Sequence, residues 1–96
     1  MTATYAWIID KDHTYDTNTT ANLNAIGVTG PRNADPELLA QLSQPTTGTP
    51  FRLYDDDDIL YYEGRIIGEF DGFEPLDDFG EPNAGCTGIR YSGDLL

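Results

Sequence analysis

Residues 51–67 read FRLYDDDDILYYEGRII, and this stretch predicts the centre of the fold. β-branched and aromatic residues, which favour strands, fill residues 51–54 and 59–67, and four aspartates separate the two runs. The pattern predicts an antiparallel hairpin with a four-residue acidic loop. Phe51 and Leu53 are two positions apart and should share one strand face. Residues 59–62 are consecutively apolar, so we expect the second strand to be central and covered on both sides.

Two details of the second strand lead to further expectations. Gly64 lies inside the run and predicts a β-bulge or a close approach of another backbone. Tyr61 and Tyr62 are adjacent, so their rings should point to opposite sides, with one of them on the surface beside the acids.

Weaker patterns lie on either side of the hairpin. Residues 4–9 (TYAWII) and 87–91 (TGIRY) predict a first and a last strand, whereas residues 10–34 are polar and predict loop. A helix should begin at Asp35 as N-cap with Pro36 in its first turn, carry Leu38, Leu39 and Leu42 on one face, and stop at Pro45. Residues 70–85 predict a turn-rich excursion with at most one helical turn. The chain should therefore be a single α+β domain over residues 1–96, with a small antiparallel sheet of about four strands and one short helix.

The composition is strongly acidic, with 17 Asp and Glu against 5 Lys and Arg in 96 residues and a net charge of −12. Binding to nucleic acid or to an anionic membrane depends on Lys and Arg, so we expect neither as a direct partner. The N-terminus lacks the basic and apolar regions of a signal peptide, and Cys86 is the only cysteine. Both features predict a cytoplasmic protein.

The negative charge is concentrated in one part of the sequence. Residues 55–81 contain 11 of the 17 acids and a single base, Arg65. One interpretation is an acidic binding surface. The other is a salt-adapted protein, in which acidity is general and marks no specific site.

The block FRLYDDDDILYYEGRIIGEFDGFEPLDDFGEPNAGCTGIRY, residues 51–91, resembles a family of small proteins of bacteria, phages and mobile elements. The shared features are an Asp-rich hairpin, a YYEG strand, and PLDDFG and PNAGC motifs, and the likeness extends to the Trp7 strand and to residues 29–31. No activity is attached to that family, so the resemblance implies no mechanism. In bulk properties the chain is also similar to phage-encoded inhibitors such as DNA mimics and anti-CRISPR proteins, which would place it in the host cytoplasm.

The concentration of acids in residues 55–81 suggests that their carboxylates substitute for the phosphates of a nucleic acid. Carboxylates on alternate strand residues are about 6.6 Å apart and form a regular anionic row. Such a row would fit the basic surface of a nucleic-acid-binding protein, with aromatic side chains as anchors. We therefore predict an inhibitory, nucleic-acid-mimicking interaction protein whose partner-binding residues are Asp55, Asp56, Asp57, Asp58, Tyr62, Glu63, Phe70, Phe73, Asp77 and Asp78.

The same aspartates allow a Ca²⁺-stabilised structural domain as an alternative. The EF-hand spacing is not met from Asp55, because Leu60 stands where Gly is required and Ile66 where Glu is required. This alternative predicts that calcium raises the melting temperature.

Catalysis has weaker support. Asp10, Asp12, His13 and Asp16 form a polar cluster, and Cys86 with His13 would suit a small hydrolase, but neither set matches a catalytic or metal-binding motif. We therefore expect no enzyme activity, no catalytic residue, no metal and no cofactor.

Overall fold

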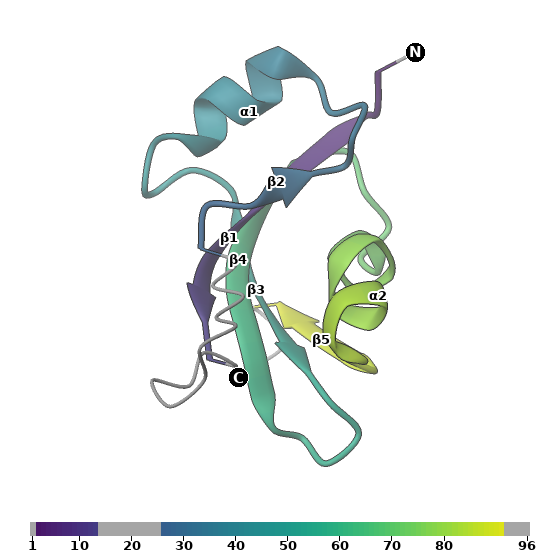
Figure 1. The fold of residues 1–96 in the computed structure, drawn as a ribbon. Coiled ribbons are helices and arrows are strands. Elements are labelled where there is room, and N and C mark those ends of the chain that lie inside the picture. Colours follow the sequence, from purple (N-terminus) through teal and green to yellow (C-terminus); the bar gives the residue numbers. More distant parts are fainter. Residues whose placement is uncertain (1, 14–25, 92–96) are drawn as a thin grey trace.

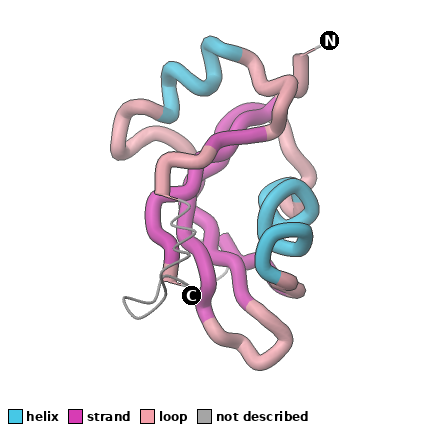
Figure 2. The backbone as a smooth tube through the Cα atoms, viewed as in Figure 1, coloured by secondary structure: helices cyan, strands magenta, loops and turns pink. Residues whose placement is uncertain are grey.

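The structure is a computed structural model that describes residues 2–13 and 26–91. An antiparallel sheet with the order β2-β1-β4-β3-β5 runs through its centre (Figures 1 and 2). Its strands are β1 (Tyr5–Asp12), β2 (Thr29–Gly30), β3 (Thr49–Tyr54), β4 (Leu60–Gly68) and β5 (Gly88–Tyr91). The helical segments are α1 (Pro36–Leu42), the π-helical turn η1 (Leu76–Gly80) and α2 (Glu81–Ala84). In the described part of the chain, no helix has the length and apolar character that crossing a membrane requires.

The small antiparallel sheet with few helices agrees with the expected class, but the element count was too low. The sheet has five strands instead of about four, because β2 pairs with Trp7 and Ile8 inside a region expected to be loop. The excursion at residues 70–85 contains η1 and α2 in succession, where at most one helical turn was expected.

The predicted hairpin is present, and β4 is the middle strand of the sheet. Phe51 and Leu53 share one face, as expected, and are almost completely buried. The register passes from Leu53↔Tyr62 to Tyr54↔Leu60, which leaves Tyr61 as an extra residue on β4. Such a bulge changes which side of the strand a residue faces, and the two tyrosine rings meet edge to face with centroids 6.3 Å apart. The prediction that they point to opposite sides is therefore wrong.

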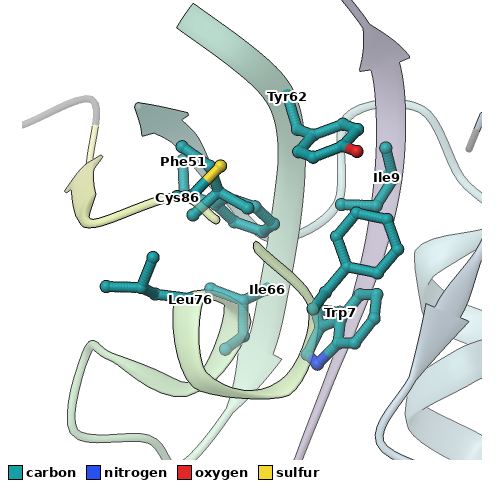
Figure 3. Close-up of a cluster of buried hydrophobic side chains, with 9 residues drawn as sticks. Trp7, Ile9, Phe51, Tyr62, Ile66, Leu76 and Cys86 are labelled. Carbon is teal, nitrogen blue, oxygen red and sulfur yellow. The ribbon is translucent and has the colours of Figure 1, made fainter. Parts of the chain in front are cut away.

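The two faces of the sheet are covered by different helical segments. We call the side covered by η1 and α2 the η1 face, and the other side the α1 face. On the η1 face lies the larger core, which includes Trp7, Phe51, Tyr62, Ile66 and Cys86 (Figure 3). On the α1 face a smaller cluster joins Leu42 to the sheet residues Ala6, Ile8 and Ile67. Ile59 precedes β4 and is 56% exposed, so residues 59–62 are not covered on both sides as expected.

Helix α1 begins where local chemistry predicts and ends at Leu42, three residues before the expected stop at Pro45. The Asp35 carboxylate accepts a hydrogen bond from the Glu37 backbone N–H at 2.9 Å, and Pro36 occupies the first helical turn. Leu42 is buried, and Leu38 and Leu39 pack beside it. The helix therefore covers one end of the α1 face and leaves the other end to polar residues.

Candidate functional site

Four of the five Lys and Arg residues of this acidic protein gather at the end of the α1 face that α1 does not cover. The strand registers Lys11↔Glu63, Arg52↔Glu63 and Arg52↔Arg90 place these side chains in one line across β1, β4, β3 and β5. We call Lys11, Glu63, Arg52 and Arg90 the charged row. Arg65 lies beside the row and is held by Asp10.

Every ion pair among the described residues uses a cation of this region. The pairs are His13–Glu63, Arg52–Glu63, Arg65–Asp10 and Arg90–Asp58, at 2.7, 3.2, 2.7 and 3.5 Å. Partial burial would raise the pKa of Glu63, but hydrogen bonds from His13 and Arg52 outweigh it, and the pKa is lowered. Glu63 is thus paired to bases on the α1 face, away from η1, and does not extend an acidic row toward Asp77 and Asp78 as predicted.

The acids that follow β4 have no cationic partner in the described structure. We call the following set the η1 acids: Glu69, Asp71, Glu74, Asp77, Asp78 and Glu81. The carboxylate of Glu74 accepts hydrogen bonds from the backbone N–H groups of Asp71 and Gly72, which lower its pKa against the opposing effect of burial. Asp78 accepts hydrogen bonds from Tyr5 and Trp7. The other four are exposed to solvent.

The aspartates of the hairpin loop lie near the residues that follow α2. Asp78 is in η1, before α2. The Thr87 backbone N–H donates to Tyr54 at 2.8 Å, which brings the chain after α2 beside the hairpin. Asp55 holds the loop, because its carboxylate accepts from the backbone N–H groups of Asp57 and Ile59, and these bonds lower its pKa. Asp56 and Asp57 are exposed at the tip. Carboxylate oxygens of Asp55, Asp56 and Asp57 lie within 4.8 Å of one another. Among the described residues, these three aspartates are the group that could hold a cation.

The predicted aromatic anchors occupy three different environments. Tyr62 is 4% exposed and packs edge to face on Phe79, so it belongs to the core and is unavailable to a partner. Phe70 is half-buried and stacks on Tyr91 with centroids 5.9 Å apart. Phe73 is 63% exposed, between acids on both sides in sequence. Of the three, Phe73 alone offers most of its side chain to a partner.

Asp78 has a structural role that its neighbour lacks. One carboxylate oxygen accepts from the Tyr5 hydroxyl at 2.7 Å and from the Trp7 indole N–H at 3.1 Å, which ties η1 to β1. Burial and the Asp78 carboxylate together raise the pKa of Tyr5. Removing Asp78 therefore leaves two donors without their acceptor.

We expect Asp78→Ala to lower the free energy of unfolding by about 1–3 kcal/mol, because hydrogen bonds to a charged group are lost. Asp77→Ala removes the same charge one residue earlier and should change stability by less than about 0.5 kcal/mol. Urea denaturation followed by the fluorescence of Trp7, the only tryptophan, measures both variants. Equal effects of the two substitutions would contradict this role of Asp78.

The structure separates the residues of the catalytic alternative. Cys86 is fully buried in the core of the η1 face, and this burial together with the charge of Asp55 raises the pKa of its thiol to about 11. His13 is hydrogen-bonded to Glu63, on the other side of the sheet. The two do not form a nucleophile–base pair. Asp10 is bound to Arg65, and Asp16 lies outside the described residues.

Two groups of candidate residues were missed by the sequence reasoning. Arg52, Arg65 and Arg90 were not considered as site residues, although Arg52 and Arg65 alternate with buried strand residues and were therefore predictable as neighbours on one face. Ile59 was assigned to a covered strand, yet it is exposed beside the acidic loop.

Comparisons with protein-family models, with curated proteins and with solved structures find no match to this chain.

Proposed function

We propose that this protein is an acidic interaction protein that occupies the basic surface of a nucleic-acid-binding protein and thereby competes with nucleic acid. The observation that carries the proposal is the segregation of charge. Four of the five Lys and Arg residues gather on the α1 face, where they pair with nearby acids, whereas the η1 acids have no cation beside them in the described structure. A salt-adapted surface has no reason to keep its bases away from one side.

The proposed surface contains uncommitted carboxylates and two exposed apolar side chains. Glu69, Asp71, Asp77 and Glu81 are exposed in the segment from the end of β4 to α2, and Asp56 and Asp57 are exposed at the hairpin tip. Phe73 accompanies the first group, and Ile59 follows the second. Apolar anchors surrounded by charge are typical of protein interfaces, in which the charges steer association and select the partner.

The chemistry of the exposed carboxylates supports the inhibitory role, and the family resemblance is the reason for proposing a phage or mobile-element origin. A basic nucleic-acid-binding surface is built to neutralise closely spaced negative charges. Carboxylates in place of phosphates satisfy the same Lys and Arg side chains, so the bound partner loses access to nucleic acid. The cytoplasm of the host cell is where we expect such a competition.

The test is a mobility-shift assay with a basic DNA-binding protein that this chain captures from a bacterial lysate at low ionic strength. We expect the chain to release DNA from that protein. The double variant Asp77→Asn with Glu81→Gln should weaken inhibition about tenfold and reduce its dependence on salt.

The matched control is Asp35→Asn with Glu37→Gln, which removes the same charge from α1. Asn still serves as an N-cap, so this helix start is preserved. Undiminished inhibition by the η1 variant, or equal losses in the variant and the control, would show that the η1 acids are not the binding surface.

A further inference from the structure

The charged row lines a pocket of about 200 Å³ on the α1 face. The charged side chains around it are Lys11, Arg52, Arg65 and Arg90, opposed by Asp10 and Glu63. The local balance is therefore positive in a protein whose net charge is −12. This pocket lies on the side of the sheet opposite to the surface proposed to bind a basic partner.

Arg52 and Arg90 are directly opposite each other on neighbouring strands. Directly paired residues of an antiparallel sheet have Cβ atoms about 5 Å apart, and like charges at this spacing repel one another. Among the described residues, two carboxylates contact the pair: Glu63, which is on the far side of Arg52 in the row and already accepts hydrogen bonds from His13 and Arg52, and Asp58, which reaches Arg90 only at 3.5 Å. An anion between the two guanidinium groups would relieve this repulsion.

Both arginines are accessible. Arg52 is hydrogen-bonded to the side chains of Tyr54 and Glu63, whereas Arg90 is weakly engaged. The side chains of Arg52 and Arg90 are 43% and 50% exposed. Arg90 reaches Asp58 only at 3.5 Å, and its guanidinium lies 4.9 Å from the centre of the Tyr54 ring, which orients it. Arg65 differs, because Asp10 and two backbone carbonyls bind its guanidinium nitrogens.

We propose that the charged row binds a phosphate monoester dianion, held between Arg52 and Arg90 with Lys11 nearby. Guanidinium groups form paired hydrogen bonds to phosphate oxygens, a geometry that ammonium groups cannot reproduce. The pocket is smaller than the roughly 300–1,000 Å³ of sites that enclose drug-sized ligands, which favours a phosphate group with a small substituent. Long polyanions would be repelled by the net charge, whereas a small dianion feels mainly the charges within about 8 Å at physiological salt.

The test is a titration with inorganic phosphate at constant ionic strength, followed by backbone amide NMR. We expect saturable shifts centred on β3 and β5. Arg90→Gln should weaken phosphate binding about tenfold, as expected for the loss of hydrogen bonds to a charged ligand. Arg90→Lys keeps the charge and should still weaken binding severalfold, because the paired geometry is lost.

The control is Arg32→Gln, which removes one positive charge outside the charged row and should leave the affinity within about twofold. Equal weakening by Arg90→Gln and Arg32→Gln, or the absence of saturable shifts up to about 50 mM phosphate, would overturn the proposal. O-phosphoserine and a phosphoserine peptide distinguish the source of the phosphate: tighter binding of the peptide assigns the site to phosphoproteins, and equal binding assigns it to small metabolites. Neither result depends on a basic protein partner, so this proposal and the proposed function fail separately.

Discussion

Gly64→Ala is expected to lower the free energy of unfolding by about 3 kcal/mol or more, at the upper end of the cost of overpacking. Gly64 lies in the middle strand, paired with Ile9 on one side and Phe51 on the other. A Cβ atom there would overlap the backbone carbonyl oxygen of Ile8 and stand 2.7 Å from Cζ of Phe51. Two neighbouring strands hold these atoms, so a side-chain rotation cannot remove the overlap.

The size of this effect matters because a domain of this length has only about 5–14 kcal/mol of stability in total. Urea denaturation followed by Trp7 fluorescence gives the measurement. Gly88→Ala is the matched control, since Gly88 is also in a strand, but no atom lies within 4 Å of its Cβ position. We expect that substitution to be neutral or to stabilise by up to about 1 kcal/mol.

A second variant distinguishes the two sources of overlap. Phe51→Leu removes the outer ring atoms near Gly64 but leaves the Ile8 carbonyl in place. The cost of Gly64→Ala should persist in the Phe51→Leu background if the backbone contact dominates. Similar stabilities of Gly64→Ala and Gly88→Ala would contradict the close approach that both the sequence and the structure indicate.

Elements with strong local chemistry were predictable from the sequence. The hairpin follows from two β-favouring runs around four aspartates, and the start of α1 follows from Asp35 and Pro36. The close approach at Gly64 is of the same kind, because a glycine inside a strand run has few structural explanations. These features depend on residues that are near one another in sequence.

Features that depend on strand pairing were not predictable. Strand β2 has two residues and no pattern of its own, and it exists because it pairs with β1. The bulge at Tyr61 brings its ring to the side of β4 on which Tyr62 is buried, and Tyr62, the tyrosine chosen as a surface anchor, is in the core. The charged row joins Lys11 to Arg90 across four strands, and only the registers reveal it. The acidic part of the candidate site could be predicted, because its acids are close together in sequence. The charged row could not, because it depends on how the strands pair.

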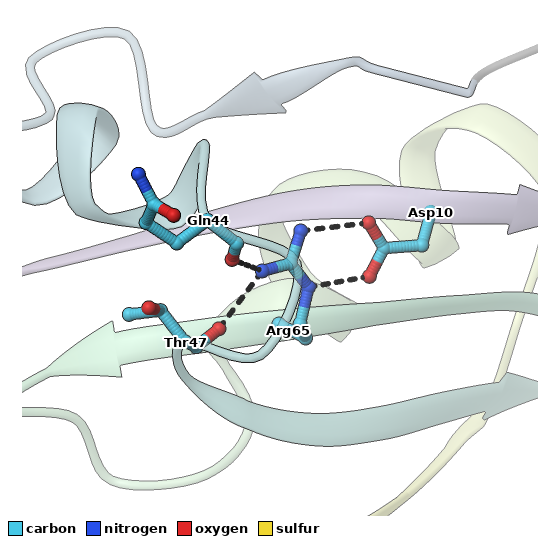
Figure 4. Close-up of polar contacts among 4 residues, drawn as sticks. All are labelled: Asp10, Gln44, Thr47 and Arg65. Carbon is cyan, nitrogen blue, oxygen red and sulfur yellow. Dashed lines mark hydrogen bonds and ion pairs between the residues drawn. The ribbon is translucent and has the colours of Figure 1, made fainter.

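Arg65 also makes contacts that the sequence did not predict, and these contacts contribute to the stability of the fold. Its Nε and Nη2 groups donate to the two carboxylate oxygens of Asp10 at 2.7 and 2.9 Å, and Nη1 donates to the carbonyl oxygens of Gln44 and Thr47 at 2.6 and 2.9 Å (Figure 4). Hydrogen bonds to Asp10 raise the pKa of this guanidinium against the opposing effect of burial. One side chain on β4 thus connects β1 to the segment between α1 and β3.

Arg65→Met is expected to cost about 2–3 kcal/mol. Removing one partner of a buried ion pair costs about 3–5 kcal/mol, because the remaining charge loses its compensation. Arg65 is 11% exposed but Asp10 is 36% exposed, so water recovers part of that loss and the estimate is reduced accordingly. Arg90→Met makes the same chemical change at a half-exposed position and should stay within about 0.5 kcal/mol.

A double-mutant cycle shows whether the loss comes from the ion pair or from packing of the arginine stem. Asp10→Asn should destabilise the natural protein, since it removes the charge that Arg65 binds through two nitrogens. In the Arg65→Met background the same substitution should be neutral or stabilising, because it removes a carboxylate that no longer has a partner. Chemical denaturation of the four proteins gives the coupling energy. If Asp10→Asn costs the same in both backgrounds, the two side chains are not coupled, and the connection between β1 and the α1–β3 segment rests on the carbonyl contacts of Arg65 alone.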